Sequence, residues 1–163
     1  MHTSTYSENG LAMRAGLAVL DVLEQEELGD RATDLGEYLR SRLRDVLASY
    51  EMVLEVRGVG LFSGIEFRAP KSISLRIPFE AFRKVHPGLF GQALVSKLFK
   101  EAGILTQICG NHFMVLKVTP PLVLTEEQAD QFVNSIRNAV EELHSSKMFW
   151  SENLELASRA IRI

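Results

Sequence analysis

The hydrophobic and polar positions of this chain change their spacing several times, and each change predicts a boundary between elements. From Asn9 the sequence is apolar or small on almost every side of a helix, except at Arg14, and polar residues become frequent from Asp21 onward. A helix that is apolar all round is one that protein covers all round. We therefore expect a helix over about 9–28 that starts at an Asn9 N-cap in a covered region and emerges into water.

A second helix is predicted after Gly29, which should break the first one, with Asp30 as the new N-cap. Apolar residues then recur every three or four positions over 30–50, as in an amphipathic surface helix. These residues are Leu35, Leu39, Leu43, Val46 and Leu47. Arginines in the C-terminal half of this helix favour its dipole, and we interpret them as a solvated face rather than a binding surface.

Strand patterns follow the second helix. Residues 53–57 alternate between apolar and polar, residues 61–67 form a second extended run, and Gly58-Val59-Gly60 should turn the chain between them. The prolines and serines of 68–78 predict a loop.

Two further helices and a hairpin are predicted next. The helices cover 79–85 and 88–102. Residues 104–109 and 112–118 then predict two antiparallel strands, because Gly110-Asn111 between them tolerates the positive φ angles of a two-residue hairpin turn.

The C-terminal part is predicted to be helical. Thr125 and Gln128 have the spacing of a capping box, which predicts the start of an amphipathic helix. A last helix is expected over about 147–161. Phe149 and Trp150 at its start are large apolar groups that pack either back on this domain or on another one, and the sequence does not decide between these alternatives.

These elements together predict an α+β fold. We expect a small antiparallel sheet of three to four strands, covered by helices from both ends of the chain. The apolar first helix has no obvious place in so small a domain and would suit an interface to a larger one.

Composition and charge narrow the class of protein. The chain has 46% hydrophobic and 24% charged residues, which is typical of a globular protein, and its net charge of −3 gives no electrostatic reason to expect nucleic acid or an anionic membrane as partner. The longest apolar stretch near the start, 11–23, is too short and too charged for a membrane span. The single cysteine, Cys109, excludes an internal disulfide, and we expect a soluble cytoplasmic protein.

Few residues suggest chemistry by their spacing alone. The four histidines and Cys109 have no metal-ligand spacing, so no metal site is expected, and Cys109 is interpreted as a half-buried strand-end residue. Gly58-Val59-Gly60 lacks the third glycine of a dinucleotide fingerprint. Arg57 has either a structural role or a carboxylate partner across a domain interface.

Five blocks of sequence follow one another in a familiar order. They are His2-Thr3-Ser4-Thr5 (H-x-S-T), 18–24 (A-x-x-V-L-x-x-L-E), 31–36 (R-A-x-x-L-G), 56–66 (V-R-G-x-G-L-M-x-G-I-E), and 116–122 with 125–128 (L-R-x-x-P-P-L followed by T-x-E-[EQ]). The chain therefore resembles the class III pyridoxal-phosphate (PLP) aminotransferases of the ornithine, acetylornithine and 4-aminobutyrate type, from His2 to about Leu143.

The resemblance implies a fold-type I PLP enzyme that works as a homodimer, with this chain supplying mainly its C-terminal domain. Residues 1–28 would be the cofactor-phosphate segment and connecting helix, 29–146 the small C-terminal domain, and 147–163 an extra helix. Ser4 and Thr5 would bind the phosphate of the partner subunit's PLP, which hydroxyl and N–H donors near a helix N-terminus suit. The alternative is that they only cap the first helix.

One motif position departs from the family. The arginine that commonly binds the substrate α-carboxylate corresponds to Lys117, which has charge but no planar fork for two hydrogen bonds. An amine substrate without an α-carboxylate, or a carboxylate held differently, would explain this change. Alternatively, Lys117 is a solvated strand lysine.

The cofactor lysine of the family precedes the H-x-S-T block, and no lysine of this chain lies in similar surroundings. The resemblance therefore implies part of a transferase that moves amino groups between an amine or amino acid and a keto acid, and that is inactive without a large PLP-binding domain. The alternative is a non-catalytic module that keeps the small-domain fold and dimerises or binds a partner protein.

Overall fold

The computed structural model describes residues 9–110, 112–145 and 149–151. Nine helices and strands are assigned within this part of the chain. In order they are α1 (Gly10–Gln25), α2 (Leu28–Leu47), β1 (Val53–Val59), β2 (Phe62–Phe67), α3 (Ile73–Val85), α4 (Leu89–Ala102), β3 (Gln107–Cys109), β4 (His112–Val118) and α5 (Glu126–Ser145). No helix among the described residues is long and apolar enough to cross a membrane.

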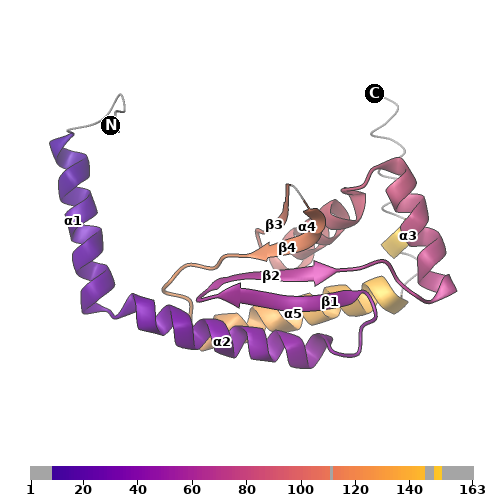
Figure 1. Ribbon diagram of the computed structural model, residues 1–163, viewed down its shortest axis with the longest axis horizontal. Coiled ribbons are helices and arrows are strands. Elements are labelled where there is room, and N and C mark those ends of the chain that lie inside the picture. Colours follow the sequence, from indigo (N-terminus) through magenta and orange to yellow (C-terminus); the bar gives the residue numbers. More distant parts are fainter. Residues whose placement is uncertain (1–8, 111, 146–148, 152–163) are drawn as a thin grey trace.

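The four strands form one antiparallel sheet in the order β1-β2-β4-β3. Helices α2 and α5 run side by side beneath this sheet, and α3 and α4 lie toward its other end (Figure 1). The core lies between the sheet and the helices, where Ile65 and Leu116 of the central strands are fully buried. The predicted α+β fold with three to four antiparallel strands is thus confirmed, with four strands.

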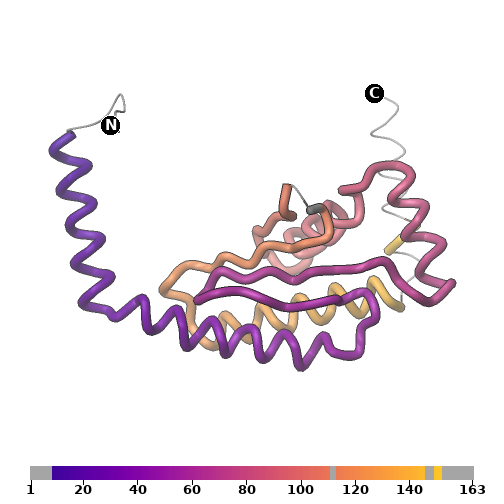
Figure 2. Tube along the Cα trace, viewed as in Figure 1, coloured from indigo at the N-terminus to yellow at the C-terminus, as the bar shows by residue number. Residues whose placement is uncertain are grey.

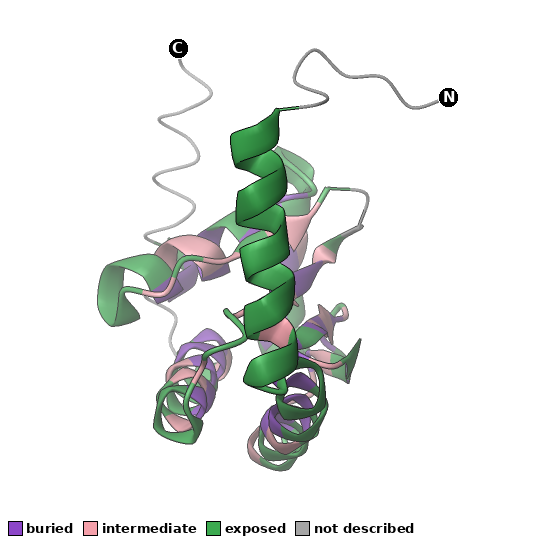
Figure 3. Ribbon diagram, turned by 90° about the vertical axis from the view of Figure 1, so that its left-hand side faces the viewer, coloured by how far each residue is buried: buried purple, intermediate pink, exposed green. Residues whose placement is uncertain are grey.

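Helix α1 stands apart from this domain. It projects away from the start of α2 (Figures 1 and 2), and none of its residues is buried in this chain. Figure 3 shows it as exposed along almost its whole length, and only Leu23 near its end is of intermediate burial. Asn9 is the expected N-cap, because its Oδ1 accepts hydrogen bonds from the N–H groups of Leu11 and Ala12 at 3.0 and 3.1 Å.

The predicted break at Gly29 is wrong. Helix α1 ends at Gln25, the chain turns at Glu26 and Glu27, and Gly29 lies inside α2. Glu27 adopts the left-handed conformation at φ 49°, and the next residue, Leu28, is buried in the domain. The turn therefore lies where burial of Leu28 requires it, not where glycine would make it easiest. Asp30 is in the first turn of α2, where its charge favours the helix dipole, rather than at the N-cap.

The predicted loop over 68–78 is also partly wrong, because α3 already begins at Ile73 and contains Pro78. Proline in a helix removes one hydrogen bond and costs roughly 3 kcal/mol. Buried side chains on both sides of it, Leu75 and Phe79 with Phe82, offset this cost by packing into the core.

The strand ends differ from the sequence pattern in two places. Gly58 and Val59 belong to β1 and pair with Ser63 and Phe62, so the turn lies at 60–61 rather than at 58–60. Residues 104–106 are not part of β3, which is only Gln107–Cys109. The expected hairpin is confirmed as an antiparallel β3–β4 pair, while Asn111 lies outside the described residues.

The C-terminal part largely follows the prediction. Thr125 and Gln128 exchange the two hydrogen bonds of a capping box, at 3.0 and 3.2 Å, at the start of α5. Phe149 and Trp150 pack back on this domain: both are buried, and the Trp150 indole N–H donates to the carbonyl of Leu143 at 3.0 Å. Most of the predicted last helix lies outside the described residues.

Candidate functional site

The sequence placed candidate site residues in two regions, and the structure describes one of them. Ser4 and Thr5 lie outside the described residues. Lys117 is the last residue but one of β4, which is one of the two inner strands of the sheet. It is half-buried, and its neighbours Leu116 and Val118 are buried in the core. Because side chains alternate along a strand, Lys117 is directed to the sheet face that is turned away from the core.

A single row of residues crosses all four strands at Lys117. Gly64 of β2 is its partner on one side and Gln107 of β3 on the other, and Arg57 of β1 is the partner of Gly64. Residues directly opposite one another in an antiparallel sheet lie on the same face. We call these four residues, Arg57, Gly64, Lys117 and Gln107, the cross-strand row. The sequence did not single out Gly64 and Gln107, because only the strand register places them beside Lys117.

Arg57 is paired within the sheet rather than left for a distant partner. Its Nη1 donates to Glu66 of β2 and, at 2.9 Å, to Glu55 of β1. These carboxylates, Glu66 first, raise the pKa of the Arg57 guanidinium. Arg57 therefore has a structural role through Nη1, which makes both ion pairs. Its Nε and Nη2 have no hydrogen bond or ion pair with a described residue.

Lys117 differs from Arg57 in this respect. Its ammonium has no hydrogen bond or ion pair with the part of the chain that the structure describes, although its backbone carbonyl accepts from the Thr106 hydroxyl at 2.5 Å. Lys97 illustrates the contrast, because its side chain is held by Glu101 and Glu142. Burial alone would lower the pKa of Lys97, but the two carboxylates raise it on balance. Lys117 is thus a half-buried cation whose charge has no counterpart among the described side chains.

The hairpin that carries Arg57 and Gly64 is fixed to α2 by a buried arginine. The Nη1 of Arg40 donates to the carbonyl of Gly60 in the turn and to the Ser63 hydroxyl at 3.3 Å. The Nη2 of Arg40 donates to the carboxylate of Glu37. The hydrogen bond from Arg44 is the main cause that lowers the pKa of the Glu37 carboxyl, and the one from Arg40 is the second. The side chain of Arg40 is only 6% exposed. This contact sets the position of β1 and β2 relative to the helices.

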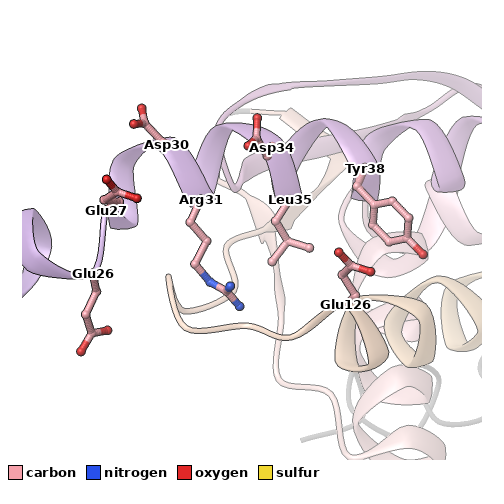
Figure 4. Close-up of a pocket in the computed structure, with 8 residues that line it drawn as sticks. All are labelled: Glu26, Glu27, Asp30, Arg31, Asp34, Leu35, Tyr38 and Glu126. Atoms are coloured by element: carbon pink, nitrogen blue, oxygen red, sulfur yellow. The ribbon is translucent and has the colours of Figure 1, made fainter.

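A second candidate, an acidic pocket of about 460 Å³, lies where α1 meets α2. Figure 4 shows that Arg31, Leu35 and Tyr38 point toward the start of α5, whereas Asp30 and Asp34 point the opposite way. Arg31 donates to the carbonyl of Leu124 at 2.6 Å, and the Tyr38 hydroxyl donates to Asp130, which raises the pKa of Tyr38. The carboxylates therefore diverge, and no group of described His, Cys, Asp or Glu residues is arranged to hold a metal ion.

Comparison with known proteins identifies the family. The family model described as aminotransferase class III matches residues 1–140. The chain belongs to the class III aminotransferase family. This class III chain is 34% identical over 146 residues to an uncharacterised aminotransferase of Sinorhizobium fredii, and the match covers 87% of this chain and 29% of that protein.

Solved structures agree with this assignment. A transaminase from a study of directed evolution by ancestral reconstruction superimposes with a TM-score of 0.73 at 35% identity, covering 90% of this chain and 30% of that one. Ornithine aminotransferase from Toxoplasma gondii superimposes with a TM-score of 0.69 at 29% identity, covering 88% and 30%. The class III chain thus spans about three tenths of the length of the relatives it matches.

Proposed function

We propose that this chain is the C-terminal portion of a PLP-dependent transaminase, which moves an amino group between an amine or amino acid and a keto acid. The family match over residues 1–140, combined with coverage of only 29% of a relative's length, carries this proposal. The large PLP-binding domain is then supplied by sequence that precedes the matched region. The proposal also divides the chain into a cofactor-phosphate segment with its connecting helix (1–28), a small C-terminal domain (29–146) and an extra helix (147–163).

The exposed apolar surface of α1 supports the proposal that this chain packs against a further domain. Apolar side chains cover it, and Met13, Leu17 and Leu20, which share one side at helical spacing, are 53%, 55% and 56% exposed. A contiguous exposed apolar surface of this kind marks an interaction site. The proposed partner for α1 is the large domain, in a homodimer whose subunits share the cofactor sites.

The donor chemistry of the first residues fits PLP. Thr3, Ser4 and Thr5 offer hydroxyl groups just before a helix N-terminus, which is where a phosphate dianion is stabilised. Asn9 already satisfies the N–H groups of Leu11 and Ala12, so Ser4 and Thr5, rather than the first turn of α1, are proposed to hold the phosphate of the partner subunit's PLP. PLP supplies an electron sink for the amino-group carbon when it is bound.

Lys117 is proposed to contact the substrate. The residue is half-buried, its ammonium has no partner among the described residues, and the sheet face on which it lies is turned away from the core. A lysine contributes charge without the planar fork of an arginine. The substrate is therefore either an amine without an α-carboxylate or a carboxylate whose second oxygen is held by another group.

No lysine of this chain is proposed to carry the cofactor, and the chain alone is proposed to be inactive. Lys97 is engaged by two carboxylates, and Lys117 is assigned to the substrate. A reducing cytoplasm is the proposed location, with which the single Cys109 is compatible.

Size-exclusion chromatography of the purified chain, with and without the variant Leu17→Glu/Leu20→Glu, tests whether α1 is an interface. We expect the chain to self-associate through α1 and the double variant to elute as a smaller species. Asp21→Ser, a polar change on the same helix, should behave like the parent chain. A parent chain that is monomeric at all concentrations would contradict an interface role for α1 and remove this support for a missing domain.

A further inference from the structure

One side chain after the end of α5 contacts three helices at once. The ring of Trp150 packs edge-on against Phe82 of α3, with the ring centroids 5.0 Å apart, and stacks on Phe90 of α4 at 6.4 Å. Its indole N–H donates to the carbonyl of Leu143 near the end of α5 at 3.0 Å. Trp150 is only 4% exposed. A single residue therefore joins α3 and α4 to α5.

The hydrogen bond from Trp150 satisfies a group that α5 cannot satisfy by itself. The last four carbonyls of a helix have no partner within the helix, and the Leu143 carbonyl is one of these because α5 ends at Ser145. A buried tryptophan N–H in turn needs an acceptor. The bond fixes the polar edge of the indole, while the aromatic contacts fix its apolar part.

The remaining attachments of α3 are concentrated at its start. The N–H and the hydroxyl of Ser72, just before the helix, donate to the carboxylate of Glu51. Pro78, in the middle of the helix, lacks the N–H that would bond to the preceding turn. Among the described helices and strands, α3 packs mainly against α4. Its second half is therefore held by core contacts and not by polar contacts like those at its start.

A pocket of about 470 Å³ lies between α3 and α5. Leu75 and Pro78 of α3 line it from one side, His144 of α5 from the other, and Trp150 also belongs to its lining. Protein interiors are close-packed and leave few voids larger than a water molecule. Helix α3 is thus packed incompletely on α5, and Trp150 bridges the two helices at the edge of this pocket.

We propose that α3 is a lid, hinged at its Glu51-capped start, and that Trp150 holds this lid closed on the core. Opening separates the aromatic side chains of α3 from those of α4 at one end of the domain, while the sheet, α2 and α5 keep their packing. Trp150 lies beside α3, in the short segment 149–151 drawn in yellow (Figure 1). This segment follows residues 1–140, so the contact that closes the lid lies outside the part of the chain that the class III family model matches.

Amide hydrogen exchange of the 163-residue chain, measured for individual residues by NMR, tests this lid. In Trp150→Ala we expect the amides of residues 79–85 in α3 to lose about tenfold more protection than those of α2, because the lid opens without the rest of the domain. Trp150→Phe keeps an aromatic ring but removes the donor to Leu143. It should give the same pattern with a smaller difference of about fivefold, as for the loss of one hydrogen bond.

Leu35→Ala is the matched control. Leu35 is buried like Trp150, but it lies in the first half of α2, at the end of the domain away from α3 (Figure 1). Removing core contacts there should lower the protection of α2 and α3 by the same factor. A loss selective for α3 in this control would overturn the proposal, because opening of α3 would then not depend on Trp150.

The two Trp150 variants decide the question together. An equal loss of protection in α2 and α3 would overturn the proposal, because Trp150 would then contribute to the stability of the whole core like any other buried side chain. If Trp150→Ala does not fold, the ratio of the two losses in Trp150→Phe decides in the same way.

Discussion

The carbonyl oxygen of Gly60 lies against Gly36, so near that a Cβ on Gly36 would be 1.9 Å from it. Gly36 belongs to α2 and Gly60 to the turn between β1 and β2, at φ 53°. The same carbonyl accepts from the buried guanidinium of Arg40. Gly36 and Gly60, which are 24 residues apart, thus meet at one backbone contact, which holds the hairpin with Arg57 and Gly64 on the helix layer.

Replacing Gly36 with alanine should destabilise the protein. The clashing atoms belong to backbone, so the hairpin must move away from α2, and overpacking of this kind costs about 1–3 kcal/mol or more. The free energy of unfolding from urea denaturation measures this change. Gly29→Ala in the same helix is the control, because no atom lies within 4 Å of its Cβ, and it should be neutral or stabilising by up to about 1 kcal/mol. Equal effects of the two variants would contradict the close contact.

Replacing Arg40 with methionine should cost about 1–3 kcal/mol of unfolding free energy, because the part-buried carbonyl of Gly60 and the buried hydroxyl of Ser63 lose their donor. The comparison is Arg42→Met, whose side chain is 44% exposed and pairs with Asp130 on the surface. Surface pairs of this type contribute 1 kcal/mol or less, as an order-of-magnitude value. Thermal or urea unfolding of the two variants should therefore separate them clearly, and a neutral Arg40→Met would exclude an anchoring role for Arg40.

The hydrogen bonds of Glu51 lead us to expect that the protein loses stability as the pH falls into the acid range. Its carboxylate accepts from the Ser72 hydroxyl and from the N–H groups of Ser72 and Lys71 before α3, and these hydrogen bonds lower its pKa. A group whose pKa is lower in the folded state stabilises above its unfolded pKa, about 4.3, and this contribution is lost as the pH falls through the folded pKa. Glu51→Gln should thus lower the urea midpoint at pH 7.

The difference between Glu51→Gln and the parent chain should become small at about pH 2, where the carboxyl of the parent chain is protonated as well. Glu24→Gln on the exposed helix α1 should leave the midpoint unchanged at both pH values. A Glu51→Gln effect of the same size at pH 7 and pH 2 would mean that the charge of Glu51 contributes nothing to the cap.

Local chemistry made several elements predictable from the sequence. The Asn9 cap and the Thr125–Gln128 capping box need only residues within three positions of each other, and both formed as expected. Positions decided by packing were not predictable in this way. The chain turns at Glu27 because Leu28 is buried. Helix α3 passes through Pro78 because buried side chains before and after it, Leu75 and Phe79 with Phe82, reach the core.

The candidate site was predictable only in part. Lys117 was identified through its place in a family motif, and its own pattern would equally suit a solvated strand residue. The row with Arg57, Gly64 and Gln107 depends on the register of three strand pairs, and Gln107 lies ten residues before Lys117 in an unremarkable segment. A one-residue shift in any pair would place these side chains on opposite faces.

The most direct test of the central claim is a PLP titration of the purified chain, followed by visible absorbance. If the chain is the C-terminal portion of a transaminase whose cofactor lysine lies in preceding sequence, no lysine-dependent absorption band should develop. Replacing Lys117, Lys97 or any of the other four lysines should then leave the spectrum unchanged. A shifted band that saturates with PLP and disappears when one lysine is replaced would contradict the account, because these 163 residues would then form a covalent cofactor site of their own.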